Sequence, residues 1–554
     1  MALLIIILLV GALGIWWPQH TRRRRAEQIP QPPDLAAETL SLREAVADAD
    51  RKARLTPNSG DAVGRLGMLY HANHVCGPAE QCYELATRLA ARDSRWPYLL
   101  AAVRQETGRS EGVLEQLRRA VELAPDYAPA HLKLGDLLLK SNQPAAAEQE
   151  YRRTLQLLPS DPYALLGLAR IAVGQGQWQA AESHLRRAVG TDPKFGVGHR
   201  LLATVYEKTG MAEKAAVSQA HANTCTRFRP APDPWVDSLD DFCYDPTFLL
   251  VRADAARQLR ETKRGLVLLR RAVKVAPDSA KAHLALGTAL REIGDFDGAE
   301  PHLVRAVQLD PKSEEAVCEL GVWQGAKGRE AEAVKSLETA LRINPASTTA
   351  YYNLGLVARH RGAEAAAAAR FLRACELSDF RFDEAVENYV GCLVRTNQQA
   401  QAIEFLQRIL VTRPTAARVW VLLARVHVNL KDPGAAADEL RKGLSYSPYN
   451  AVLAQTLAGF LMTSPQASLE DAREAITLAK RALEFGEPRD AMDTLDTLAT
   501  AYLRTRDVPQ ATAALTQAME MARQAGNQAK VDAYAQRIAS VQTGQAAPAT
   551  RGNP

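Results

Sequence analysis

The sequence has few cysteines and no disulfide framework. Seven cysteines are spread over 554 residues, too few to hold a small secreted fold together. Cys225 and Cys243 flank an irregular segment and would pair only if this region lay outside the cytoplasm. Cys318, Cys375 and Cys392 fall in predicted helices, and we expect them to be small packing residues.

The sequence also lacks the short motifs of catalysis and cofactor binding. It contains no C-x-x-C-H, no Gly-rich phosphate loop, no G-x-S-x-G and no H-E-x-x-H. The net charge is +5, and the run Arg22–Arg25 supplies four of these charges. The rest of the chain is nearly neutral, which gives no case for nucleic-acid binding. We therefore expect neither an enzyme nor a cofactor.

One group of residues has the chemistry of a metal site: His71, His74, Cys76 and Cys82. Histidines three positions apart share a helix face, and zinc accepts two nitrogen and two sulfur ligands. However, His71 and His74 end one predicted helix, Cys82 lies in the packing stripe of the next, and the spacing fits no zinc-knuckle pattern. We expect structural roles for all four, and a metal-binding protein stays open as an alternative.

What the sequence does have is a proline every 34 residues. The period is seen at Pro125, Pro159 and Pro193, again at Pro277, Pro311 and Pro345, and from Pro414 to Pro448. A fixed period of this size is the signature of stacked structural repeats, each burying its apolar face on its neighbours.

Each repeat is predicted to be two helices joined by a turn. In the unit 280–311, apolar residues recur at helical spacing on both sides of Gly294-Asp295, which is a turn signal. Pro311 ends the unit, because proline lacks the amide and blocks the preceding turn. Gly287 and Ala299 are small, as a close crossing of the two helices requires.

These residues resemble the tetratricopeptide repeat consensus. The unit matches at His283, Leu286, Gly287, Leu290, Ala299, Leu303, Ala306 and Pro311, and other units match in the same register, for example at His131, Gly135, Ala147, Tyr151, Gly355, Ala367 and Phe371. The resemblance implies an all-α fold, a right-handed α-solenoid of about thirteen helix-turn-helix repeats. It also implies binding of other proteins without catalysis.

An irregular segment divides the repeats into two blocks. The interval from Pro193 to Pro277 is 277 − 193 = 84 residues, two periods plus 16, and the extra stretch 228–245 is rich in proline, acidic and aromatic residues. This insertion either re-registers two blocks of repeats or folds back so that Trp235 and Phe242 plug the groove. The expected organisation is an apolar anchor at 1–21, a basic flank and linker at 22–57, repeat blocks at 58–227 and 246–524, a capping helix at 525–541 and a disordered tail at 542–554.

The N-terminus reads as an uncleaved signal-anchor helix. Residues 2–17 carry no charge and would span about 24 Å as a helix. Trp16 and Trp17 suit the membrane interface, and Arg22–Arg25 follow, which predicts repeats on the cytoplasmic side. A periplasmic or extracellular location is the alternative. An anchor followed by repeats resembles the bacterial lipopolysaccharide assembly protein B family, although this chain lacks that family's C-x-x-C pairs.

The resemblance implies that the first helix of each unit lines a concave groove. In the consensus register the inward positions include Tyr163, Leu166, Arg170, Arg200, Leu250, Arg257, Arg291, Tyr352, Arg359, Arg425 and Asn429. Arginine and tyrosine are common interface anchors, and arginine binds carboxylates in a bidentate manner. These residues are predicted to bind partner proteins or peptide segments, and self-association is possible.

The function that these patterns favour is a membrane-tethered scaffold that holds an extended segment of a partner protein in its groove. One alternative is an extracytoplasmic repeat protein of envelope or exopolysaccharide assembly. The other is the metal-binding protein built on the Cys/His group.

Overall fold

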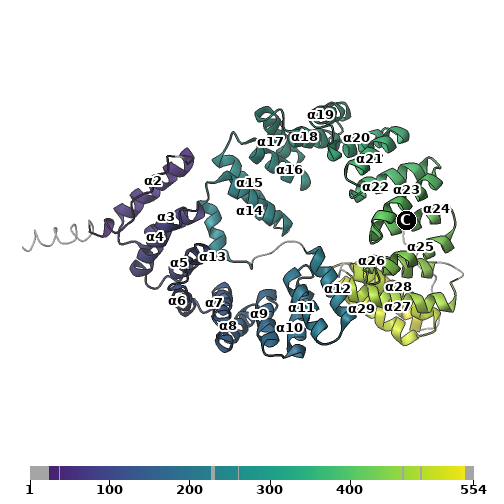
Figure 1. Ribbon diagram of the computed structural model, residues 1–554, viewed down its shortest axis with the longest axis horizontal. Coiled ribbons are helices and arrows are strands. Elements are labelled where there is room, and N and C mark those ends of the chain that lie inside the picture. The colour runs from purple at the N-terminus through teal and green to yellow at the C-terminus, as the bar shows by residue number, and fades with distance from the viewer. Residues whose placement is uncertain are drawn as a thin grey trace, which may run out of the picture. The chain divides into compact units, whose positions relative to one another are not determined.

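The computed structural model describes residues 24–36, 38–225, 231–259, 261–463, 467–486 and 490–542, and every regular element in these ranges is a helix (Figure 1). The expected anchor at 1–21 and nearly all of the expected tail lie outside them. In the ranges just given, no helix is both long and apolar enough to cross a membrane.

The first of two compact units covers Met1–Asp310. After α2 (Leu40–Leu55), its helices contact one another in consecutive pairs, interrupted once by the short helices α13 (Pro234–Asp237) and η1 (Ser238–Phe242). The pairs are α3 (Gly60–Ala72) with α4 (Cys76–Leu89), α5 (Arg95–Glu106) with α6 (Val113–Leu123), α7 (Ala128–Lys140) with α8 (Pro144–Leu157), α9 (Pro162–Gly174) with α10 (Trp178–Thr191), α11 (Gly196–Lys208) with α12 (Ala212–Thr224), α14 (Pro246–Gln258) with α15 (Thr262–Val275), and α16 (Ala280–Glu292) with α17 (Phe296–Leu309).

The second unit covers Pro311–Pro554. Its pairs are α18 (Glu314–Ala326) with α19 (Glu330–Ile343), α20 (Thr348–His360) with α21 (Glu364–Leu377), α22 (Asp383–Arg395) with α23 (Gln399–Thr412), α24 (Ala417–Asn429) with α25 (Pro433–Tyr446), α26 (Ala451–Thr463) with α27 (Leu469–Phe485), and α28 (Ala491–Arg504) with α29 (Val508–Gln524). Seven pairs in the first unit and six in the second make thirteen pairs among the described residues.

Local signals explain where these helices begin and turn. Ser279 precedes α16, and its hydroxyl accepts a hydrogen bond from the backbone N–H of Ala282, which satisfies a donor at the helix start. Ser313 and Ser347 cap α18 and α20 in the same way. Gly294, between α16 and α17, has a φ of 83°, a conformation that costs glycine little.

The helices of a pair cross where the sequence predicted small residues. Ala299, Leu303 and Ala306 on α17 are fully buried. A Cβ added to Gly287 on α16 would lie 2.7 Å from Cγ of Leu303, so the two helices approach more closely than a larger side chain allows. The small residues therefore set the spacing of the hairpin.

Helix α30 (Gln528–Gln542) packs against α29 at the end of the second unit. Val531 and Tyr534 on α30 are buried, and Arg537 is ion-paired with Asp496 on α28. The arrangement covers apolar surface that the last pair would otherwise expose.

Candidate partner-binding groove

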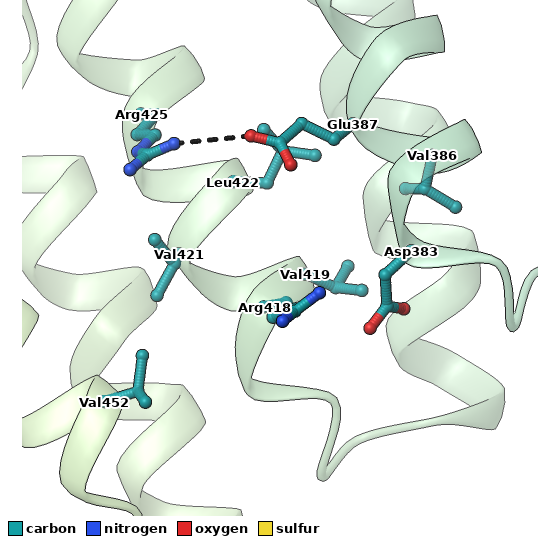
Figure 2. Close-up of a pocket in the computed structure, with 9 residues that line it drawn as sticks. All are labelled: Asp383, Val386, Glu387, Arg418, Val419, Val421, Leu422, Arg425 and Val452. Carbon is teal, nitrogen blue, oxygen red and sulfur yellow. Dashed lines mark ion pairs between the residues drawn. The ribbon is translucent and has the colours of Figure 1, made fainter. Parts of the chain in front are cut away.

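The first helices of four successive pairs in the second unit border a depression on the surface. A cavity of about 240 Å³ lies between α22, α24 and the start of α26 (Figure 2). Its apolar lining consists of Val386, Val419, Val421, Leu422 and Val452. Its charged lining consists of Asp383, Glu387, Arg418 and Arg425.

A second depression of about 390 Å³ adjoins the first and extends to α20. The two share Glu387, Leu422 and Arg425, and the second adds Arg359, Asn388 and Asn429 among its lining residues. The guanidinium of Arg359 donates a hydrogen bond to the Asn388 side-chain oxygen. The Asn388 amide nitrogen lies 3.3 Å from the Tyr352 hydroxyl. We call these joined depressions the unit-2 groove.

Two ion pairs at the rim of the unit-2 groove are loose. Arg425 lies 3.6 Å from Glu387, with exposed side-chain fractions of 64% and 62%. Arg418 lies 3.6 Å from Glu384, and both side chains are again largely exposed. Solvent-exposed ion pairs contribute little to stability, so these arginines can exchange their present partners for the carboxylates of a ligand at small cost.

Tyr352 on α20 lies beside the groove, next to the lining residue Asn388, and is half-buried against two phenylalanines. Its ring centroid lies 4.7 Å from that of Phe382 and 5.7 Å from that of Phe371. Burial, and next the negative charge of Glu384, raises the pKa of Tyr352. Its hydroxyl therefore stays protonated at neutral pH and can take part in hydrogen bonds with a ligand.

Four of the predicted groove residues thus come together in the second unit: Tyr352, Arg359, Arg425 and Asn429. The other seven lie in the first unit. Arg170 and Arg200 are exposed, Arg257 is paired with Asp254 and Glu292, and Tyr163, Leu250 and Arg291 are half-buried. Leu166 is only 5% exposed and packs in the core with Leu202, so it offers little surface to a partner.

Several residues in or beside the unit-2 groove were not singled out from the sequence. Glu384, Arg418 and Val452 stand second in their first helices, and Glu387 and Val421 stand fifth. Tyr352, which the consensus register gave, also stands fifth in its helix, so the same register would have predicted Glu387 and Val421. At α22 the register is harder to assign, because Asp379 stands where the preceding unit would end in proline.

The insertion folds back onto the first unit (Figure 1). The ring of Trp235 is stacked on that of Tyr127, with centroids 3.6 Å apart, and meets Tyr98 edge-on. Asn73, directly after α3, donates to the carbonyl oxygen of Phe242 and accepts from the N–H of Tyr244. Residues 231–245 therefore fold back onto earlier repeats of the same unit.

The Cys/His group does not assemble a metal site. The ring nitrogens of His71 are engaged by the Tyr83 hydroxyl at 3.2 Å and by Glu106 at 3.0 Å, and the His74 ring packs on Phe248. No group of three or more His, Cys, Asp or Glu residues is placed to hold a metal within the described ranges. The metal-binding alternative is therefore unsupported.

The cysteines beside the insertion are not joined to each other. Cys225 and Cys243 are both thiols rather than halves of a disulfide. Cys243 is buried, and its Sγ lies 3.7 Å from the carbonyl oxygen of Asp245. The fold-back arrangement therefore rests on noncovalent contacts: hydrogen bonds, ion pairs and ring contacts.

Paired helices with small residues at their crossings, and a groove along the first helices, define an α-helical repeat protein. Family models described as tetratricopeptide repeats match residues 106–171, 138–204, 250–314, 324–382 and 417–450. The repeats in these segments are tetratricopeptide repeats, a module that suggests a protein–protein interaction scaffold.

No curated protein matches the sequence. Among solved structures, the crystal structure of yeast Tom70 is similar at 15% sequence identity. The match covers 76% of this chain and 97% of that chain, with a TM-score of 0.40.

Proposed function

We propose that the chain is a membrane-tethered scaffold that binds an extended segment of a partner protein in the unit-2 groove, without catalysis. The observation that carries the proposal is the groove itself, where an apolar floor contributed by α22, α24 and α26 is bordered by loosely paired arginines. On such a surface, a peptide can bury apolar side chains on the floor, and the arginines at the border can select peptides that carry matching polar groups.

The lining residues indicate the chemistry of the segment. Val421, Leu422 and Val452 accept an aliphatic side chain, because burying apolar surface is favourable at roughly 25 cal/mol per Å². Arg418 and Arg425 flank this floor and bind carboxylates in a bidentate manner. The expected ligand is a segment in which an aliphatic residue is followed or preceded by acidic residues. Recognition then rests on several shallow contacts and no covalent step.

The tether is proposed from the sequence of residues 2–17 and the arginines that follow. An uncharged run next to interfacial tryptophans and a basic cluster favours anchoring with the basic side in the cytoplasm. The repeats would then present their groove close to the inner face of the membrane.

Charge reversal in the groove tests the binding proposal. The full chain carrying Arg359→Glu and Arg425→Glu should recover at least about tenfold less of the principal partner from detergent-solubilised membranes, because each reversal repels the acidic ligand. The matched control carries Arg342→Glu and Arg373→Glu, two exposed arginines on the second helices α19 and α21. Equal capture by both variants, with unchanged thermal unfolding, would rule out the unit-2 groove as the binding site.

The tether has its own test. Protease added to intact spheroplasts should leave the repeats undigested, whereas lysis should expose them. A chain lacking residues 2–17 should leave the membrane fraction. Digestion from outside would instead favour the extracytoplasmic alternative, and membrane association without residues 2–17 would refute the anchor.

A further inference from the structure

The insertion places the carboxylate of Asp233 in a site formed by three side chains of the repeats, which we call the carboxylate receptor. The Asp233 carboxylate accepts hydrogen bonds from the Tyr98 hydroxyl at 2.6 Å and the Tyr127 hydroxyl at 2.8 Å. The ammonium of Lys133 lies 2.8 Å away. Asp233 is buried, and a buried charge is tolerated only where it is paired and hydrogen-bonded. All three donors belong to the repeats, on α5, on α7 and just before α7.

An aromatic slot lies beside this carboxylate receptor. Trp235 is stacked on Tyr127 with an interplanar angle of 13°, and its centroid is 5.1 Å from that of Tyr98. Its backbone N–H donates to the Tyr127 hydroxyl at 2.9 Å. Lys133 also lies over the Tyr98 ring at 4.7 Å. One lysine and two tyrosines therefore contact the carboxylate of Asp233, the indole ring of Trp235 and the backbone N–H of Trp235.

The tyrosines are suited to hold an acid and would lose partners without one. Burial, and next the charge of Asp233, raises the pKa of both Tyr98 and Tyr127. Both hydroxyls therefore remain donors at neutral pH. An empty site would leave the buried Tyr98 and the half-buried Tyr127 hydroxyls without their charged acceptor.

The rest of the insertion is held by separate contacts. Asp240 pairs with Arg252 at 2.6 Å and with Arg264 at 2.9 Å, and Asn73 binds the backbone at Phe242 and Tyr244. None of these contacts involves Asp233 or Trp235, so they would still hold the rest of the segment if its first part left the receptor. They also give Asp233 and Trp235 a high effective concentration at the site, which favours occupancy from within the chain.

We infer that residues 233–235 are a displaceable internal ligand of a second peptide-binding site on α5 and α7, and that a partner segment with a carboxylate two residues before an aromatic ring binds there by replacing them. The site is defined by Tyr98, Tyr127 and Lys133. It lies in the first unit and is independent of the unit-2 groove.

A peptide supplied in trans tests this inference on the full chain. The probe is a fluorescein-labelled peptide of residues 231–237, and the receptor is emptied by Asp233→Asn with Trp235→Ala. The emptied protein should bind the peptide saturably, and wild type should bind it at least about tenfold more weakly because the internal ligand competes. A peptide with Asn and Ala at the two key positions should not bind.

Two further variants locate the binding. Adding Lys133→Met and Tyr98→Phe to the emptied protein should abolish peptide binding, whereas adding Arg359→Glu and Arg425→Glu in the other unit should leave it unchanged. The inference is overturned if the folded, emptied protein does not bind the peptide, or if wild type binds it equally well. It is also overturned if both the emptied protein and a chain with residues 231–237 replaced by a Gly/Ser linker fail to fold, since the segment would then be a structural part of the unit.

Discussion

Nε2 of His283 lies 3.0 Å from the carbonyl oxygen of Pro277, six residues earlier, so this ring nitrogen ties the first helix of a repeat to the end of the preceding one. His131 binds Pro125 and His199 binds Pro193 in the same way. Trp420 donates to Pro414 at 2.8 Å. Histidine and tryptophan are interchangeable at this slot because each brings a ring N–H to the same carbonyl.

Replacing His199 with Phe should therefore weaken the first unit even though an aromatic ring is kept. The hydrogen bond from Nε2 to Pro193 is lost, and a typical loss is about 1 kcal/mol of unfolding free energy. Urea unfolding monitored by circular dichroism measures it. An unchanged urea midpoint of unfolding would show that position 199 requires only an aromatic ring and not the hydrogen bond.

Replacing Ala299 with Leu should overpack the crossing of α16 and α17. Ala299 is fully buried on α17, and added methylene groups in a close-packed core cost about 1–3 kcal/mol. The matched control is Ala255→Leu on the exposed face of α14, which should change little. Equal melting temperatures for the two variants would contradict the assigned crossing.

Acidification should destabilise the first unit through three histidines. Burial lowers the pKa of His184, His199 and His302 below the ordinary value of 6.5. His199 faces His221, His302 faces His283 and Arg270, and His184 lies near Arg187 and Arg152. The unfolded chain thus binds protons more readily, so stability present above pH 6.5 is lost as the pH falls through the folded-state pKa values.

Thermal unfolding between about pH 7.5 and about pH 5.5 measures this loss. A variant with glutamine at positions 184, 199 and 302 cannot titrate there and should lose less stability over the same interval. A wild-type melting temperature that is constant or rises on acidification would refute the assignment.

Replacing Asn73 with Ala should loosen the insertion. Its side chain makes two hydrogen bonds to the backbone at Phe242 and Tyr244, of 2.8 Å and 2.7 Å, and their loss should cost about 1–3 kcal/mol. Hydrogen exchange should then accelerate around residues 242–248. Asn223→Ala, at an exposed position on α12, is the control. Equal hydrogen exchange in both variants would show that the two hydrogen bonds of Asn73 do not hold the insertion in place.

The sequence predicted the helix pairs, their crossings and part of the groove because these features recur at a fixed period. Gly287 and Ala299 could be assigned from one unit alone, and the fifth position led to Tyr352. The same position in another repeat is Leu166, which is buried. The repeat position alone does not tell how closely the first helix of the following repeat packs against such a residue.

The contacts of the insertion could not be read from the sequence. Asp233 meets Tyr98 and Tyr127, which lie 135 and 106 residues away along the chain. The segment occurs once, so it has no period that would give its place on the repeats. Its aromatic and acidic composition suggested a plug, but only the folded chain shows which donors receive the acid.

Site-specific photocross-linking shows whether the partner binds in the unit-2 groove. A photoreactive residue at Val452, which lines the groove and is 49% exposed, is compared with one at Val411 on the second helix α23, which is 83% exposed. We expect the partner to be cross-linked from position 452 and not from position 411. Cross-linking from position 411 alone, or equally from both, would contradict it.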